Sequence, residues 1–419
     1  MRDPAAYKGR EQTWLKHRVL EEYLAAWAQK LGSVSRQREV RLWSVDCFSG
    51  PWQSADDDLK DTSISIGLDE LRAAAETWAQ KGHGLKLGAI FVEKDKKAFA
   101  ALERFVADHK AGVDVFTYRG EFGDHVATIQ KHIGGEDSAF LFVDPTGWKG
   151  AAMDFIKPLA RLPRRDVLVN VMFHHINRFK DDPRRFLREQ MRDFFGLGES
   201  ELTPDLSEDQ LMSLYRDRLK SVCGVKYAAD LVIPQPTKEQ TKFRLVIGGH
   251  HPAVVKLFRD VERRVVGGEA AAVRSAAKDR QSGQEGAGLL FGSTAPLEDR
   301  RYQELRDQGI RELRAELPRH LAARPLRYGD LWPRVLEACH LTESDLKGLL
   351  WDMRNAGKIV IEGLRAKERS LKDNHVVRLA LASATVERRC PRCGADAETV
   401  EVELPSGRRE QFCERCRPR

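Results

Sequence analysis

The residues best suited to chemistry in this chain are acids and glycines that directly follow short apolar runs. Four such stretches occur: Asp46-Cys47-Phe48-Ser49-Gly50, Glu93, Arg119-Gly120-Glu121 and Asp144-Pro145-Thr146-Gly147-Trp148. A turn of small residues lets backbone N–H groups approach a ligand, and a carboxylate at the end of a strand can accept both hydroxyls of a ribose. The combination predicts a nucleotide-type site.

The apolar runs themselves must position these residues. They cover residues 42–45, 87–92, 113–118 and 139–143, and each has the length and character of a buried strand. A helical pattern resumes near Ser63 after the first turn. Parallel strands bring their carboxyl ends to one edge of a sheet, where open α/β folds bind ligands. The first turn taken alone is equally typical of a plain βα unit, because it has one glycine where a dinucleotide fingerprint has three.

This order of motifs resembles class I S-adenosylmethionine-dependent methyltransferases. The resemblance implies an α/β fold, a Rossmann-like sheet with helices on both faces. It implies that the turn from Asp46 to Gly50 cradles the methionine part of S-adenosylmethionine and that Glu93 holds its ribose. Asp144 and Pro145 would receive an amine, and Trp148 would stack an extruded base. The expected cofactor-binding residues are Asp46, Phe48, Ser49, Gly50, Glu93 and Glu121.

Residues 7–266 also resemble one narrower family, the three-Cys-motif partner proteins. The motifs that carry this resemblance are Trp14-Leu15-Lys16-His17, Asp46 to Pro51, Phe91-Val92-Glu93-Lys94-Asp95, Phe142 to Gly147 and Phe243-Arg244-Leu245-Val246. The resemblance implies a methyltransferase-like fold and a partner protein of the radical type with a three-cysteine motif. It implies no particular reaction.

Length and composition leave room for several domains. With 419 residues, 42% hydrophobic and 32% charged, the chain has an ordinary globular composition, and we expect a cytoplasmic protein. No run of about 18 apolar residues and no apolar leader are present, so no membrane span is expected. The net charge of +7 favours polyanionic partners. We expect a methyltransferase-like domain at 1–266, a flexible linker at 267–297, a winged helix at 298–383 and a zinc ribbon at 384–419.

The first domain has two further features, a helix near its start and a pair of histidines. Residues 11–31 predict an amphipathic helix that packs across the sheet. Lys16 and His17 on this helix are expected at a solvated helix end rather than against a substrate phosphate. His174 and His175 follow a predicted fifth strand at 166–173, and we expect a structural or substrate-contacting role for them because no third metal ligand stands nearby.

The predicted winged helix has a helix over 331–338, a second helix capped by Thr342, and strands at 358–363 and 376–380. The second helix would read nucleic acid and the loop between the strands would contact phosphates, although many winged helices bind proteins instead. The candidate nucleic-acid-binding residues are Lys347, Trp351, Arg354, Arg365, Lys367 and Arg369.

The last motif is two Cys-x2-Cys pairs, Cys390 with Cys393 and Cys413 with Cys416, separated by a predicted hairpin. Four thiolates on two tight turns suit a closed, tetrahedral structural zinc site. Free or disulfide-bonded cysteines are the alternative. The remaining cysteines, Cys47, Cys223 and Cys339, are expected to be small buried residues.

Two functions remain open from the sequence. The first is a methyltransferase that modifies an amine of a nucleic-acid base. The second is a repurposed, non-catalytic sheet in a nucleic-acid-binding partner of another enzyme. The single-glycine turn at Gly50 is the feature that separates them, because a site for the methionine carboxylate needs open backbone there.

Overall fold

The computed structural model describes most of the chain, and the account below is confined to the residues it describes. These are residues 3–50, 61–179, 182–198, 202, 205–282, 299–365, 368, 370–380, 393, 399–403, 409–413 and 415–416, with backbone alone for 399–403 and 409–413.

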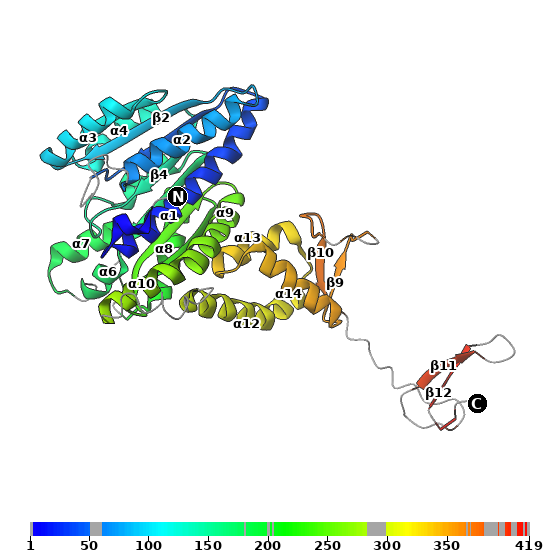
Figure 1. The fold of residues 1–419 in the computed structure, drawn as a ribbon. Coiled ribbons are helices and arrows are strands. Elements are labelled where there is room, and N and C mark those ends of the chain that lie inside the picture. The colour runs from blue at the N-terminus through cyan, green and yellow to red at the C-terminus, as the bar shows by residue number, and fades with distance from the viewer. Residues whose placement is uncertain are drawn as a thin grey trace, which may run out of the picture.

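A seven-stranded sheet forms the centre of the first part of the chain (Figure 1), in the order β3-β2-β1-β4-β5-β7-β6. Its strands are β1 (Arg41–Asp46), β2 (Lys86–Glu93), β3 (Asp114–Arg119), β4 (Ser138–Val143), β5 (Arg165–Val171), β6 (Tyr227–Pro234) and β7 (Thr241–Gly249). The first five strands are mutually parallel, and β7 runs antiparallel between β5 and β6. The expected parallel sheet is confirmed, and β7 and β6 add an antiparallel pair at one edge.

The register of the central strands follows from side-chain size. Trp43 on β1 lies directly opposite Gly88 on β2. A Cβ atom at Gly88 would stand 2.3 Å from the Trp43 ring, so only glycine leaves room for the indole. The indole Nε1 donates a hydrogen bond to Asp137 at 2.9 Å, which satisfies its polar atom at the edge of the core.

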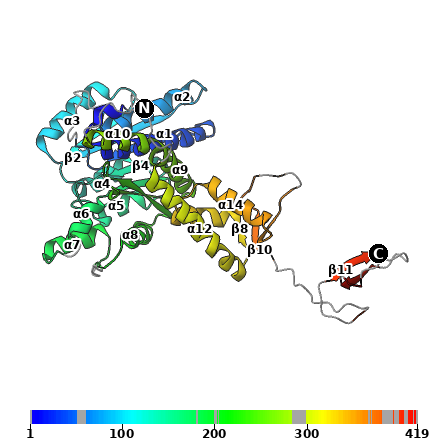
Figure 2. The same cartoon turned by 60° about the horizontal axis from the view of Figure 1, so that its bottom comes forward.

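Helices cover both faces of the sheet (Figure 2). They are α1 (Glu11–Gly32), α2 (Ser63–Ala79), α3 (Lys96–His109), α4 (Phe122–His132), α5 (Met153–Ala160), α6 (Phe173–Phe179), α7 (Arg185–Phe194), α8 (Glu208–Cys223) and α9 (Ala253–Glu262), with short 3-10 turns η1 (Pro4–Tyr7) and η2 (Ser33–Arg36). One hydrophobic core lies under α1, α2, α3 and α9, and a second lies under α4 to α8. The helix expected over 11–31 is confirmed as α1, but most of its length is buried and it does not present the solvated polar face that was expected.

The fifth strand is shorter than predicted. It ends at Val171, and residues 173–179 form helix α6. The carbonyl of Met172 accepts hydrogen bonds from the backbone N–H groups of His175 (2.9 Å) and Ile176 (3.2 Å), which start the helix at once. His174 and His175 therefore lie in the first turn of a helix and not on an extended strand end.

Helical structure continues where a linker was expected. After α9 the chain forms a π-helical segment, η3 (Arg263–Glu269), and then α10 (Ala270–Ser282). These segments are held on α1 by ion pairs of Glu269 with Arg18 (2.9 Å) and of Arg280 with Glu11. Residues 283–297 lie outside the described residues.

The following part of the chain has the predicted helix and strand order. It comprises α12 (Arg300–Ala323), β8 (Leu326–Arg327), α13 (Tyr328–Ala338), α14 (Glu343–Asn355), β9 (Ile359–Glu362) and β10 (Val376–Leu379). Thr342 caps α14 as predicted: its hydroxyl accepts from the N–H of Asp345, whose carboxylate accepts from the N–H of Thr342. The three strands form an antiparallel sheet in the order β8-β10-β9.

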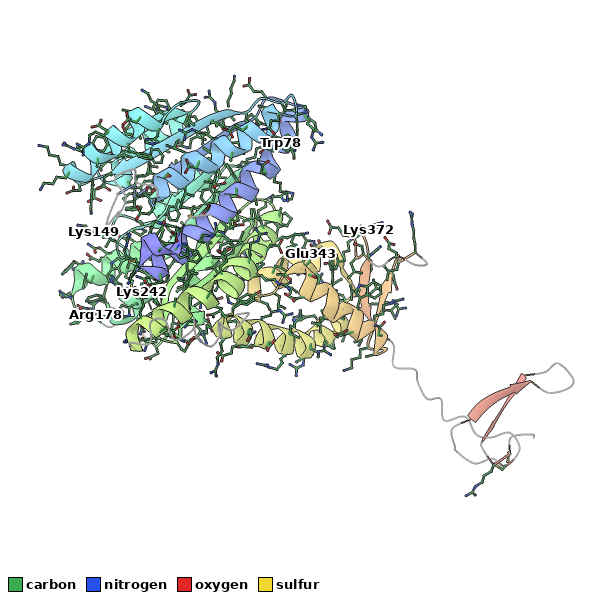
Figure 3. The ribbon with its side chains drawn as sticks, viewed as in Figure 1. Trp78, Lys149, Arg178, Lys242, Glu343 and Lys372 are labelled. Carbon is green, nitrogen blue, oxygen red and sulfur yellow. The ribbon has the colours of Figure 1, made fainter. Side chains whose placement is uncertain are left out.

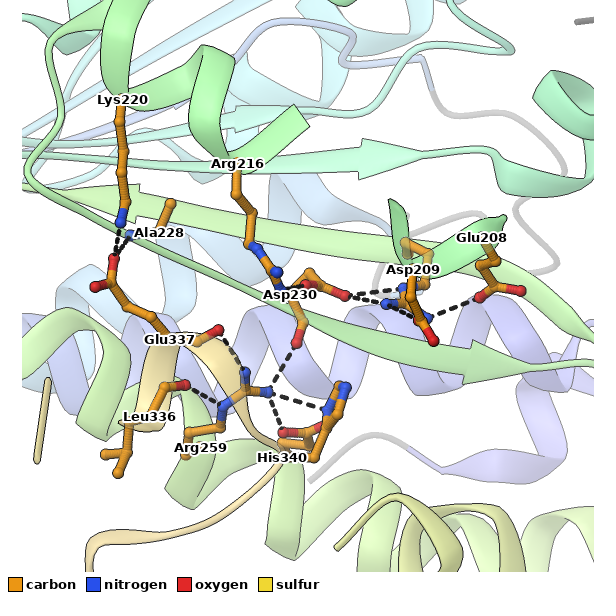
Figure 4. A network of polar contacts seen from close by, with 12 residues as sticks. Glu208, Asp209, Arg216, Lys220, Ala228, Asp230, Arg259, Leu336, Glu337 and His340 are labelled. Atoms are coloured by element: carbon orange, nitrogen blue, oxygen red, sulfur yellow. Dashed lines mark hydrogen bonds and ion pairs between the residues drawn. The ribbon is translucent and has the colours of Figure 1, made fainter. Parts of the chain in front are cut away.

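A buried polar network joins this winged helix to the edge of the large sheet (Figure 4). Arg259 of α9 is 1% exposed and donates to the carbonyls of Leu336 (2.8 Å) and Asp230 (2.7 Å). Its guanidinium also pairs with Glu262 at 2.6 Å, and the same carboxylate bonds His340 at 2.6 Å. Because Leu336 and His340 belong to the winged helix, one arginine connects both parts of the chain.

The carboxylate of Asp230 anchors a second set of charges in the same network. It is fully buried and pairs with Arg244 of β7 and with Arg216 of α8. Burial acts to raise its pKa, but the Arg244 and Arg216 guanidiniums hold the pKa of Asp230 well below its usual range.

At the carboxyl end, β11 (Thr399–Glu403) and β12 (Arg409–Cys413) form the hairpin expected between the cysteine pairs. Cys390 and the side chain of Cys413 lie outside the described residues. The described residues contain no group of three or more His, Cys, Asp or Glu placed to hold a metal, and none of their helices is long and apolar enough to cross a membrane.

Candidate functional site

A cleft of about 550 Å³ lies at the carboxyl ends of the parallel strands. Three of the four acids that the sequence placed at one sheet edge line it, namely Glu93, Glu121 and Asp144. The cleft is lined by Arg10, Thr13, Lys16, His17, Cys47, Phe48, Gly50, Asp61, Thr62, Ser63, Val92, Glu93, Lys94, Gly120, Glu121, Phe122, Asp144, Pro145, Thr146, Lys149, Asn170, Met172 and Phe243.

Asp46 shapes the glycine turn from behind and does not line the cleft. Its carboxylate accepts hydrogen bonds from the Phe48 N–H at 3.0 Å and from the Ser63 hydroxyl at 2.6 Å. Burial raises the pKa of Asp46 to about 6. Each carboxylate oxygen accepts one of these bonds, so this acid orders the turn and the start of α2.

Ser49 has a similar structural role. It is fully buried, and its hydroxyl donates to the Asp46 carbonyl at 2.8 Å and accepts from the Val92 N–H at 3.2 Å. Its own N–H donates to the Val92 carbonyl at 2.8 Å. These bonds tie the turn to β2, and Phe48 and Gly50 are the predicted cofactor residues of this turn that face the cleft.

Glu93 lies at the end of β2 and lines the cleft, as predicted. Its Oε1 accepts from the Asp95 N–H at 2.5 Å, and burial raises its pKa. Beside it, Gly120 has φ of 149°, and a Cβ there would stand 2.7 Å from the His125 ring, so the chain needs glycine at this wall. Glu121 lies at the rim, 3.6 Å from the Lys94 ammonium.

Asp144 is held from two sides at the opposite end of the cleft. Its Oδ1 accepts from the Asn170 amide at 2.6 Å, and its Oδ2 forms an ion pair with Lys16 of α1. The Lys16 ammonium also lies 5.5 Å from the centre of the Phe243 ring. The Oδ1 of Asn170 is buried and has no hydrogen-bond partner in the described structure. This leaves an unsatisfied acceptor at the wall of the cleft.

Sequence reasoning missed several of these residues. Lys16 and His17 were expected at a solvated helix end, yet each is 8% exposed and lines the cleft. His17 bonds the Tyr7 hydroxyl at 3.1 Å. Their neighbours Trp14 and Leu15 are buried too. The only signal in the sequence was that the two polar residues directly follow this apolar pair. Asn170 stands inside an apolar strand with no motif around it, so nothing in the sequence distinguished it.

Trp148 does not line the cleft, whereas Pro145 does. The indole is 7% exposed, belongs to the second core and makes an edge contact with Phe179, with ring centres 5.7 Å apart. A base in the cleft therefore finds no stacking surface on Trp148 in this arrangement.

Some of the residues predicted to bind nucleic acid have partners within the chain, and others are exposed. Lys347 of α14 pairs with Glu343 at 2.8 Å, and the Arg354 guanidinium lies over the Trp351 ring at 4.9 Å. Arg354 and Arg365 are exposed, while Lys367 and Arg369 lie outside the described residues. Trp351 with Arg354 is thus the part of this surface open to a partner.

Comparison with solved structures found methyltransferases at low similarity. The O-methyltransferase TomG from Streptomyces achromogenes in complex with SAM is 14% identical, with a TM-score of 0.29, over 54% of this chain and 79% of that one. The SAH-bound methyltransferase PaMTH1 from Podospora anserina is 11% identical, with a TM-score of 0.24, over 54% and 77%. Protein LPL1258 from Legionella pneumophila is 8% identical, with a TM-score of 0.33, over 59% and 91%. The function proposed below does not depend on overlaps of this size.

The curated protein sequences contain no match to this chain. A family model described as a GMT-like wHTH domain matches residues 274–363. This segment runs from within α10 through β9 and includes both α13 and α14. The chain therefore contains a GMT-like winged helix-turn-helix domain beside a seven-stranded α/β sheet with a cleft at its strand ends.

Proposed function

We propose that this protein transfers a methyl group from S-adenosylmethionine to an amine of a nucleic-acid base. The observation that carries the proposal is the composition of one cleft. The glycine turn and the Glu93 carboxylate line it together with Asp144, Pro145 and Asn170, and the acceptor oxygen of Asn170 is unsatisfied.

The cofactor end of the cleft fits S-adenosylmethionine chemically. Gly50 lines the end of the cleft where the methionine part would lie, and the buried Glu93 carboxylate suits two ribose hydroxyls. Phe48 and Phe122 line the cleft with ring centres 5.8 Å apart, an apolar surface for a purine. A volume of about 550 Å³ is typical of small-molecule sites. When bound, this cofactor supplies an electrophilic methyl group on a sulfonium.

The acceptor end suits a primary amine. Such an amine has two hydrogens and one lone pair, and attack on the methyl carbon requires that the lone pair point at it. Asn170 Oδ1 is free to accept one hydrogen, and the Asp144 carboxylate or the Pro145 carbonyl can accept the other. With the cofactor bound, Asn170 and Asp144 would hold the amine so that its lone pair faces the methyl group, and the amine would lose one proton to water as it is methylated.

The nucleic-acid part of the proposal is supported by the winged helix. Domains of this type commonly place their second helix in a groove of DNA. Here that helix is α14, with Trp351 and Arg354 on its surface. The excess of positive charge over the whole chain, +7, is consistent with a polyanionic substrate.

Isothermal titration of S-adenosylmethionine into the purified full-length protein tests the cofactor. We expect saturable binding. Glu93→Ala should weaken the binding free energy by about 1 to 3 kcal/mol, the contribution of a charge-assisted hydrogen bond. Glu76→Ala on the surface of α2 is a matched control with no expected effect. Unchanged affinity in Glu93→Ala would remove the acid from the cofactor site. Transfer of a radiolabelled methyl group to mixed DNA and RNA then tests the reaction.

A second function is favoured by one contact. The Lys16 ammonium occupies Asp144 Oδ2, an acceptor that the amine mechanism uses. In this alternative the cleft is a repurposed platform, and the chain binds nucleic acid as partner of a radical-type protein with a three-cysteine motif. Absence of S-adenosylmethionine binding in the titration, together with retained nucleic-acid binding, would favour this alternative.

A further inference from the structure

A group of positive side chains borders the acceptor end of the cleft. We call it the basic rim and define it as Lys149, Arg178 and Lys242, with His174 and His175 between them. Lys149 follows β4 and lines the cleft, the histidines and Arg178 lie on α6, and Lys242 lies on β7. Figure 3 labels Lys149, Arg178 and Lys242 along the same side of the sheet domain.

Two observations show that these groups are near neighbours. Burial lowers the pKa of His175, and the charges of His174, Lys242 and Arg178 lower it further. A Cβ placed on Gly147 would stand 3.7 Å from the His175 ring, so α6 adjoins the loop that carries Lys149. Positive side chains from α6 and β7 and from the loop after β4 therefore gather beside the cleft.

Among the described residues, the cations of the rim have no acidic partner. Lys149, Arg178 and Lys242 form no ion pair within the described structure. Other cations at the cleft do: Arg10 pairs with Asp61 at 2.9 Å, and Lys94 lies 3.6 Å from Glu121. Like charges that converge without a counterion repel one another, so an arrangement of this kind is stabilised when an anion binds.

We propose that the basic rim binds phosphates of a single-stranded nucleic acid whose base enters the cleft. This inference rests on the proposed function and specifies the form of its substrate. A base stacked inside a duplex cannot enter a cleft of this size, so the strand must be single or locally opened. Phosphates flanking the extruded nucleotide would then lie outside the acceptor end, where Asp144 and Asn170 are, and the rim supplies charge at that place.

The test is fluorescence anisotropy of a labelled ten-nucleotide single strand with the full-length protein, at salt concentrations from 50 to 200 mM. The rim variant is Lys149→Ala/Arg178→Ala/Lys242→Ala. The matched control is Arg104→Ala/Lys110→Ala/Lys131→Ala. It removes three exposed cations: one on α3, one directly after α3 and one on α4. Both sets are repeated in a Trp351→Ala/Arg354→Ala background, which separates the rim from the winged helix.

Each phosphate contact contributes about 0.7 to the slope of log affinity against log salt for single strands. We expect the rim variant to lose about 2 units of slope in both backgrounds, and the control to keep its slope. An unchanged slope in the rim variant would overturn the inference, as would absence of single-strand binding by the native protein at 50 mM salt. The inference would also be overturned, in favour of a protein partner, if the rim variant lost binding to an acidic peptide but kept its binding to the single strand.

The outcome is separable from that of the proposed function. Binding of the single strand is measured without cofactor, and S-adenosylmethionine titration of the rim variant is a separate readout. Retained cofactor binding with an unchanged oligonucleotide slope refutes the rim alone. Loss of slope in a protein that never binds the cofactor supports the rim and refutes methyl transfer.

Discussion

Replacement of Arg259 by methionine tests whether one buried arginine holds the winged helix on the sheet. The native side chain is 1% exposed, donates to the carbonyls of Leu336 and Asp230, and pairs with Glu262 at 2.6 Å. Methionine fills most of the volume but supplies no donor. The variant leaves the Glu262 carboxylate with its bond to His340 and removes the Arg259 donor from both carbonyls.

The expected loss follows from this geometry. Breaking a buried ion pair by removal of one partner costs about 3 to 5 kcal/mol, because the other charge stays buried. Arg264 is a matched control on the next turn: its side chain is 62% exposed and pairs with Glu22 at the surface. Surface pairs contribute about 0 to 1 kcal/mol, so Arg264→Met should be nearly neutral. The double variant Arg259→Met/Glu262→Met should regain part of the loss, because it also removes the Glu262 charge that the single variant leaves without its arginine.

Urea unfolding followed by circular dichroism gives the stability difference, and hydrogen exchange of α13 and α14 shows where it acts. A chain of this size need not unfold in one step, so the midpoint of each transition is compared separately. We expect Arg259→Met to lower the transition of the winged helix and to raise amide exchange there. Equal midpoints for Arg259→Met and Arg264→Met would refute the assignment of the network as the link.

Further predictions concern the cleft, a buried acid and the cysteines. If methyl transfer is detected, Asp144→Ala should lower turnover at least about a hundredfold while S-adenosylmethionine affinity stays nearly unchanged, because the group orients the acceptor; a normal rate in steady-state assays would exclude the amine mechanism. Burial raises the pKa of Asp166 to about 7, above its ordinary value of 3.8, so the folded state binds a proton that the unfolded state has lost. As the pH rises from 4 to 7, this group should therefore lower the free energy of unfolding by up to about 1.4 kcal/mol per pH unit. Asp166→Asn should remove this pH dependence from the unfolding curves. Elemental analysis should find one zinc per chain, held by the four C-terminal cysteines, and Cys393→Ser should abolish it; metal-free native protein would contradict this site.

Much of the fold was predictable because local patterns determine it. Apolar runs ending in an acid or glycine predicted the parallel strands to within about two residues, and the cap at Thr342 predicted the start of α14. The fifth strand was overextended, because an apolar run does not show where a carbonyl such as that of Met172 begins a helix. Glu93 was found because its position after a strand defines its place at the sheet edge.

Only the tertiary structure decided which polar groups meet. The sequence could not show that Asp46 turns both oxygens inward, because its partner Ser63 lies 17 positions away. Lys16 reaches Asp144 across 128 positions, and Asn170 gains its role from the same contact. Such pairs depend on how helices and strands pack, and their energies arise from burial. The local hydrophobic pattern of a sequence does not predict which distant polar groups are buried together. Residue types along this chain thus determined the strands, the caps and the chemistry available, whereas packing decided which of those groups share the cleft.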